Sequence, residues 1–199
     1  MREEARAIRQ QQIERAAYAV LEEKGYAGAS MLAIARRARA SNETLYSWYG
    51  DKTGLFKALV ERNASESRGL LEERIAAEGE ALETLRAFGP MLLDMLTGAR
   101  AVALNRAAAA DPSGELGRAI SAAGREAIGP LVAQVLLQAR EQCRLGFDDP
   151  GEALELYFGL LIGDLQIRCV IGRAPAPSKD ERERRSERAL QALLRLLPA

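Results

Sequence analysis

Histidine is absent from this 199-residue sequence, and cysteine occurs only twice. The lack of histidine removes the commonest general base, the His-based catalytic triads and the usual zinc ligands. Cys143 and Cys169 have neither a metal-binding nor a redox spacing, which leaves two interpretations, reduced and partly buried side chains or a redox sensor. We therefore expect no metal, no cofactor and no enzymatic activity.

Long apolar runs are also missing. No segment approaches the roughly 18 uninterrupted apolar residues of a membrane span, and the charged N-terminus lacks the apolar core of a secretory leader. We expect a cytoplasmic protein with no membrane partner. The net charge is zero at pH 7, which argues against a protein that coats nucleic acid along its whole surface. A helical enzyme is only a weak alternative. The sequence has neither a phosphate loop after a strand nor a nucleophile elbow.

Helical periodicity covers nearly the whole chain, and no alternating pattern is long enough to predict a strand. The predicted helices cover approximately residues 3–24, 31–38, 42–49, 52–78, 80–96, 99–110, 113–123, 129–144, 150–171 and 178–197. The fold class is therefore all-α, with about nine or ten helices.

Residues 25–57 alternate short helices with turn signals. Ser30 is a natural N-cap for a helix whose apolar residues recur at steps of three and four, namely Met31, Ile34, Ala35 and Ala38. A break at Arg39 and Ala40 follows. These features predict the first helix of a helix-turn-helix.

The second helix is short and polar at its N-terminal end. Ser41 is its predicted N-cap, Asn42, Glu43 and Thr44 follow, and Gly50 ends it. A recognition helix carries hydrogen-bonding groups at this end, because its first residues face base edges in the major groove. Lys52 opens the next helix, where a cation can meet a phosphate.

The runs GYxxxSMxxIARxA and SxxTLYxWYxDKxxLF resemble the N-terminal domain of the TetR family of bacterial one-component repressors. The resemblance covers residues 8–60 in detail, and beyond them the helical layout, the length and the character of the last two helices. It implies a three-helix DNA-binding domain at 1–54 and a helical effector-binding and dimerisation domain at 55–199. The residues implied at double-stranded operator DNA are Ser30, Met31, Arg39, Ser41, Asn42, Glu43, Thr44, Tyr46, Trp48 and Lys52. Packing under the recognition helix is the alternative for Tyr46.

Two positions depart from the family pattern. The turn usually carries glycine and a small aliphatic residue, where this chain has Arg39 and Ala40. A left-handed Arg39 would cost roughly 1 kcal/mol relative to glycine, so either the turn differs in shape or the charge touches a phosphate. Trp48 replaces a histidine or tyrosine and can donate but not accept a hydrogen bond. Arg2, Arg6 and Arg9 at the N-terminus either rest on phosphates or are solvated.

The resemblance also implies a cavity for an unknown, mostly apolar effector. The residues on the helices that enclose it in such proteins are Phe88, Met91, Leu92, Met95, Leu104, Val135, Tyr157 and Leu161, with Asn105, Gln134, Asp164 and Gln166 as polar residues that could orient a ligand. Methionine and leucine at helical spacing are also what an ordinary core contains. A regulator that binds DNA without a small effector is therefore an alternative function.

The last two predicted helices are unusually apolar. Residues 153–171 carry apolar side chains all round the helix axis, and the final helix has a leucine stripe. Either the pair forms an internal hairpin or it also presents a face to a second copy. Relatives in the family dimerise through their last two helices, which implies a homodimer with an interface at Tyr157, Leu161, Leu165, Leu190, Leu193, Leu194 and Leu197. The leading prediction is a ligand-released repressor on a palindromic operator.

Overall fold

The computed structural model describes residues 2–77 and 79–199, apart from the side chains of residues 2, 3 and 66. Within these residues the chain forms eleven α-helices and one π-helical segment, and no strand. The prediction of an all-α fold is confirmed. The chain divides into two compact units, Met1–Arg62 with Ala103–Ile120, and Asn63–Val102 with Ser121–Ala199.

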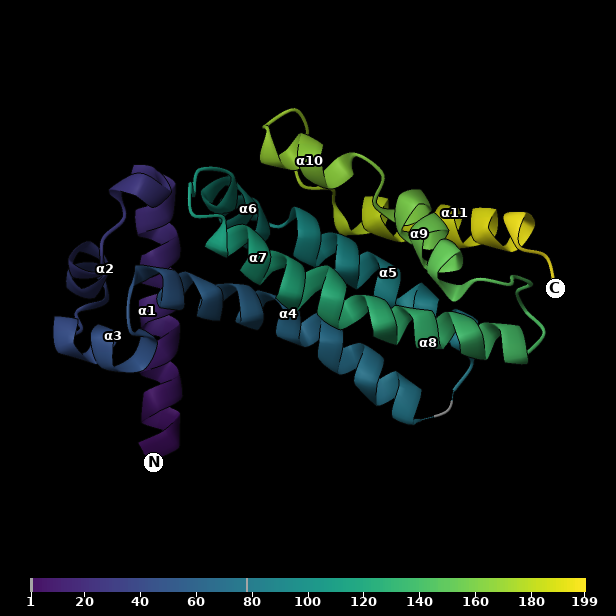
Figure 1. Cartoon of the computed structure of the whole chain (residues 1–199), viewed down its shortest axis with the longest axis horizontal. Coiled ribbons are helices and arrows are strands. Elements are labelled where there is room, and N and C mark those ends of the chain that lie inside the picture. The colour runs from purple at the N-terminus through teal and green to yellow at the C-terminus, as the bar shows by residue number, and fades with distance from the viewer. Residues whose placement is uncertain (1, 78) are drawn as a thin grey trace. The chain divides into compact units, whose positions relative to one another are not determined.

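The first unit is built on α1 (Arg2–Gly28), beside which α2 (Met31–Ala38) packs, with α3 (Asn42–Tyr49) against α2 (Figure 1). It also holds the start of α4 (Lys52–Ala76), the end of α6 (Ala99–Ala109) and most of α7 (Glu115–Ser121). The predicted last residue of α4, 78, lies outside the described residues. The side chains of this unit that are 0% exposed are Ile13, Ala17, Ile34, Leu45, Leu55 and Phe56. Each of the four helices α1 to α4 therefore contributes to one core.

Helix boundaries in this unit follow the predicted turn chemistry. The Ser30 hydroxyl accepts a hydrogen bond from Ala33 N at 3.2 Å, and the Ser41 hydroxyl accepts one from Thr44 N at 3.0 Å. Gly25 interrupts α1 with a φ of 66°, and Gly50 ends α3 with a φ of 76°. The predicted N-caps Ser30 and Ser41 and the predicted end of α3 at Gly50 are confirmed. They act through backbone groups within four residues of each other.

The second unit contains α5 (Ala81–Thr97), the π-helical η1 (Ala122–Glu126), α8 (Ala127–Glu141), α9 (Pro150–Leu161), α10 (Leu165–Val170) and α11 (Lys179–Leu196). Helix α5 packs against α8, α10 and α11, and α9 packs against α8 and α11. Figure 1 shows α5 and α8 running side by side in this unit. Asp149 is the N-cap of α9 and Ser178 that of α11, where Ser178 forms a capping box with Glu181.

The helix predicted at 150–171 is divided into α9 and α10, and this division adds the eleventh helix. Gly163, with a φ of 50°, adopts the left-handed conformation between the two. Arg185 of α11 then satisfies the end of α9, donating from Nε to Leu161 O at 2.6 Å and from Nη2 to Ile162 O at 2.9 Å. Carbonyls at a helix end lack an intrahelical donor and need such partners, and Ile162 O also accepts from Leu165 N at 3.1 Å.

Helices α5 and α11 approach closely at Gly89. A Cβ atom added there would lie 2.0 Å from Ser186 Oγ, so only glycine fits at this crossing. The adjacent side chains Phe88, Leu85, Leu190 and Leu193 are all 1% exposed or less. The core of the second unit is therefore tightly interlocked at this point.

In the described part of the chain, no single helix is long and apolar enough to cross a membrane, although α5 and α6, bent by 53°, together meet the length and composition criteria.

Candidate nucleic-acid interface

The N-terminus of α2 offers backbone donors at the surface. Ser30 is exposed and its hydroxyl is engaged by Ala33 N. The Met31 side chain is only 4% exposed and belongs to the core, so what this residue can offer DNA is its backbone N–H at the helix start. Leu32 beside it is 48% exposed. Free N–H groups at a helix N-terminus attract phosphate.

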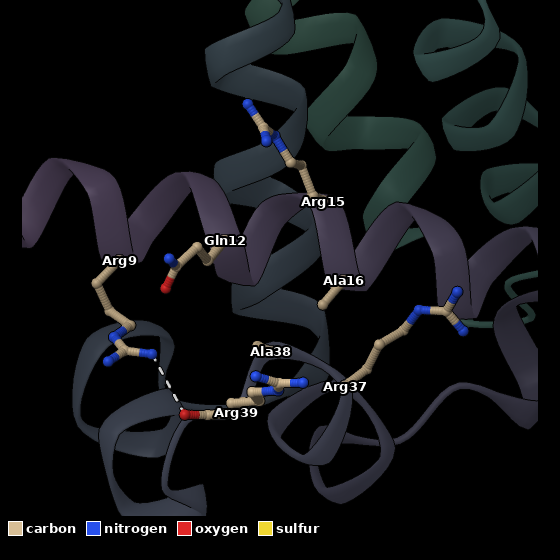
Figure 2. Close-up of a pocket in the computed structure, with 7 residues that line it drawn as sticks. All are labelled: Arg9, Gln12, Arg15, Ala16, Arg37, Ala38 and Arg39. Atoms are coloured by element: carbon tan, nitrogen blue, oxygen red, sulfur yellow. Dashed lines mark hydrogen bonds between the residues drawn. The ribbon is translucent and has the colours of Figure 1, made fainter.

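The turn after α2 contains a left-handed arginine. Arg39 has a φ of 51° and a ψ of 38°, and its N–H donates to Arg36 O at 3.2 Å while Ala40 N donates to Ala35 O at 3.0 Å. The turn thus keeps the shape for which glycine is the usual residue, with a charged side chain in its place. Arg9 Nη1 donates to Arg39 O at 3.2 Å and ties the turn to α1 (Figure 2).

Helix α3 presents a polar N-terminal end over a buried anchor. Leu45 is 0% exposed, whereas Asn42 and Glu43 are exposed. Thr44 is half-buried, and its hydroxyl lies 2.7 Å from the Ser41 hydroxyl. Asn42 and Glu43 are therefore more accessible to a base edge than Thr44, whose hydroxyl already has a partner.

The C-terminal half of α3 carries three aromatic residues. Tyr46 is 50% exposed, which leaves its ring accessible to a ligand. Trp48 is half-buried, with the Arg6 guanidinium 5.4 Å from its ring centroid and the Tyr49 ring at 6.4 Å. Burial, followed by the charge of Glu14, raises the pKa of Tyr49 to about 12. Arg6 thus contacts α3, while the side chain of Arg2 lies outside the described residues.

Lys52 begins α4 and is held against the end of α1. Its Nζ donates to Tyr26 O at 3.0 Å and lies 4.1 Å from the centroid of the Tyr26 ring. An ammonium group has three donors, so two remain for a phosphate. The contact positions the charge next to the start of α4, where Asp51 accepts from Gly54 N at 2.7 Å.

The predicted effector-site residues differ in which unit they belong to and in how deeply they are buried. Phe88, Leu92, Val135, Tyr157 and Leu161 are buried in one core cluster of the second unit, with Met91 and Met95 packed against it. Burial raises the pKa of Tyr157, whose hydroxyl donates to Leu85 O at 3.5 Å. Leu104 is buried and Asn105 half-buried, and both belong to the first unit; Gln166 is half-buried, while Gln134 and Asp164 are exposed.

A pocket of about 350 Å³ in the second unit is lined by Phe147, Asp148, Asp149, Glu152, Ala153, Leu156 and Leu197. None of the effector candidates lines it. The pocket forms where the segment before α9 meets the end of the chain, and Gly146 N donates to Leu197 O at 3.1 Å there.

The dimer candidates are mostly internal in the single chain. Tyr157, Leu161, Leu190 and Leu193 are each at most 1% exposed, and Leu165, Leu194 and Leu197 are partly buried. The exposed apolar side chains on the same helices are different: Ile167 at 55%, Ile171 after α10 at 61% and Leu196 at 57%. Sequence periodicity does not separate these two sets, because residues all round a helix are apolar there.

Arg37 was not predicted at the site, and Arg9 was predicted either to rest on a phosphate or to be solvated; the structure places both with Arg39 around one groove. The only sequence signal was the basic N-terminus. Their proximity arises from the packing of α1 on α2, which joins residues about 30 positions apart.

A short capped helix packed across a second, with its polar end exposed and cations beside it, defines a helix-turn-helix DNA-binding protein. The model of the family described as bacterial regulatory proteins, tetR family, matches residues 13–59, and that of the AefR-like transcriptional repressor C-terminal domain matches residues 83–196. The chain therefore belongs to the TetR family of transcriptional regulators.

Solved structures agree with this assignment. A TetR-family regulator from Mesorhizobium loti is 28% identical, with a TM-score of 0.79, 97% of this chain and 98% of the other being covered. A TetR regulator from Agrobacterium tumefaciens is 29% identical, with a TM-score of 0.73, and the match covers 95% of this chain and 94% of the other. The flavonoid-responsive regulator FrrA is 28% identical, with a TM-score of 0.68, and the match covers 96% of this chain and 97% of the other. Comparison with curated proteins finds no match.

Proposed function

We propose that this regulator is a repressor that binds a palindromic operator as a homodimer and is released by a small, mostly apolar effector. The observation that carries the DNA-binding part is the exposed polar end of α3, held by the Ser41 cap and by the fully buried Leu45. Asn42 and Glu43 are the accessible candidates for base contacts. The N-terminus of α2, Arg39 and Lys52 supply phosphate contacts around them.

A binding experiment can distinguish contacts to bases from contacts to phosphates. Asn42→Ala should cost about 1–3 kcal/mol, chiefly at particular base pairs, because an amide can bond bidentately to adenine. Lys52→Ala should weaken binding to all sequences and lower the slope of log K against log salt by about one for each phosphate that Lys52 neutralises. The measurement is selection from randomised duplexes followed by titration at several salt concentrations. Equal affinity for every duplex tested would exclude a sequence-specific regulator.

The effector part rests on the apolar body and on one relative. FrrA, at 28% identity over nearly the whole chain, is described as flavonoid-responsive. In this chain, Met91 and Met95 pack at the edge of the buried cluster around Phe88 and Tyr157. Methionine side chains adapt to irregular ligands, so an apolar or aromatic effector would enter by displacing them.

Such an effector acts only through its different affinity for the DNA-bound and released states. A coupling of about 1–3 kcal/mol would lower operator affinity about 5- to 150-fold. The test is a library of apolar and aromatic compounds, scored by melting temperature and by operator dissociation, with Met95→Leu and Met91→Leu expected to alter selectivity. Operator binding that no compound affects would favour the alternative, a DNA-binding regulator without an effector.

A further inference from the structure

A basic groove of about 530 Å³ lies in the first unit between α1 and the turn that follows α2 (Figure 2). Four arginines, Gln12 and two alanines line it, and no carboxylate is among the lining residues. Like charges gathered on one surface repel each other unless an anion lies between them. The groove is therefore suited to a negatively charged partner.

Two of the lining residues on α1 point to the turn. Residues 9 and 12 share a helix face, because three steps of 100° bring position 12 back to within about 60° of position 9. In Figure 2 the Arg9 side chain extends toward the turn, where its Nη1 donates to Arg39 O at 3.2 Å. A guanidinium has five N–H donors, so four remain on Arg9. These donors face the same groove as Gln12.

Arg39 supplies the second cation from the turn itself. Its left-handed backbone, with a φ of 51°, is a conformation that an arginine adopts only at a cost. Such a cost is typical of positions whose side chain has a functional role. Arg37 is a third cation, paired to Glu23 at 2.6 Å with both side chains about half-exposed. An ion pair this exposed contributes little, so Arg37 can exchange Glu23 for another anion.

We propose that the Arg9–Arg39 groove binds a backbone phosphate of the operator, at the border of the major groove that α3 enters. The proposal rests on the proposed operator binding. Arg39 is three residues before Asn42, so their Cα atoms are no more than about 11 Å apart. The major groove is about 12 Å wide, so a base edge that meets Asn42 brings a bordering phosphate close to the turn. Planar guanidinium groups bind phosphate oxygens bidentately.

The test uses the full-length protein and operators that each carry one uncharged methylphosphonate in place of a phosphate. With the wild-type protein, a methylphosphonate at one phosphate in each half-site should weaken binding. With the Arg9→Gln or Arg39→Gln protein, the methylphosphonate at that position should have no further effect. Methylphosphonates at other positions should weaken binding by these variants as much as by wild type. Each variant should also lower the slope of log K against log salt by about one for each phosphate that the replaced arginine neutralises. Base preference in the randomised selection should stay the same.

Arg118 provides the matched control. It is exposed, lies on α7 in the same unit, and is not among the residues that line the groove. Arg118→Gln removes the same charge and should leave the salt slope and the methylphosphonate pattern unchanged. Arg9→Lys should recover the slope, because it restores the charge, but not the full affinity.

Two results would overturn the proposal while operator binding itself stands. In the first, Arg9→Gln and Arg39→Gln fold normally and bind with an unchanged slope and no coupling to any phosphate. In the second, the DNA-free protein binds inorganic pyrophosphate saturably, the two variants lose this binding, and operator affinity does not change; the groove is then a site for a free anion. Failure of the proposed function is distinct, because the randomised selection then recovers no preferred site.

Discussion

Arg39 combines strain with charge at a single residue. The left-handed conformation disfavours any side chain, and glycine relieves that cost. We predict that Arg39→Gly raises the free energy of unfolding by about 1 kcal/mol or less, since glycine also increases the entropy of the unfolded chain. Chemical denaturation of the DNA-free protein measures this. Arg39→Ala is the control, since it removes the charge and keeps the strain, and an equal gain in that variant would mean that charge repulsion, not backbone strain, is relieved.

Tyr49 holds a buried hydroxyl for which the described residues provide no hydrogen-bond partner. Its pKa is raised to about 12, first by burial and next by Glu14, against 10.0 for a free tyrosine. Because the folded protein binds the phenol proton more tightly, the contribution of this group to stability is complete below pH 10 and is lost as the pH rises through 12.

Tyr49→Phe should therefore flatten the fall in stability between pH 10 and 12. The substitution should also raise stability at neutral pH by about 1 kcal/mol, because a buried hydroxyl without a partner is removed. Urea denaturation across this pH range gives both values. Tyr46→Phe, at a side chain that is 50% exposed, is the control and should change neither. If the free energy of unfolding falls equally with pH in wild type and in Tyr49→Phe, the loss of stability does not come from Tyr49.

At the scale of elements, α9 depends on α11 for its end. Arg185 donates to two carbonyls at the C-terminus of α9, at 2.6 and 2.9 Å. Hydrogen bonds from a charged donor contribute about 1.5–3 kcal/mol each, and carbonyls without partners are costly where water is excluded. We predict that Arg185→Met lowers the free energy of unfolding by about 2 kcal/mol and speeds amide exchange near Gly163.

The adjacent Arg184 is exposed and gives a matched control. Arg184→Met removes the same charge from α11 and should change stability by less than about 0.5 kcal/mol. If the two variants are equally stable, the α9 end does not depend on Arg185. Denaturant titration distinguishes these outcomes.

At the scale of the whole molecule, the proposed homodimer needs an apolar surface on each copy. Leu161 and Leu193 are 0% exposed, so replacing either with glutamate should unfold the chain. Ile167 and Ile171 are more than half exposed and four residues apart, so they form an apolar patch on one side of α10. Exposed apolar patches of this kind are covered in oligomers.

We predict that the double change Ile167→Asp and Ile171→Asp yields a folded monomer with reduced operator affinity. Sedimentation at micromolar concentration measures the mass, and circular dichroism the fold. Ile8→Asp is the control, because Ile8 is 58% exposed on α1 and should leave the mass unchanged. A wild-type monomer would refute the proposed dimer, whereas a dimeric double variant would place the interface on other residues of α9 and α11.

Local sequence is enough to predict most of the helices, the caps of α2 and α3 and the family. The hydroxyls of Ser30 and Ser41 accept hydrogen bonds from backbone N–H groups three residues away, so local order is enough to predict these caps. The same holds for the helix-turn-helix, whose apolar residues recur at steps of three and four along the chain. For the turn at Arg39 the sequence left two shapes open, and the structure shows the left-handed one.

Which side chains are available for function depends instead on how the helices pack. Lys52 with Tyr26, Arg9 with Arg39, and Arg185 with Leu161 are separated by 26, 30 and 24 positions in the chain. Periodicity shows that a residue is apolar or charged and on which helix face it lies, but a contact over such a separation depends on how two helices pack. That is why Tyr157 and Leu193, which were candidates for the dimer interface, proved to be buried in the core of their own chain.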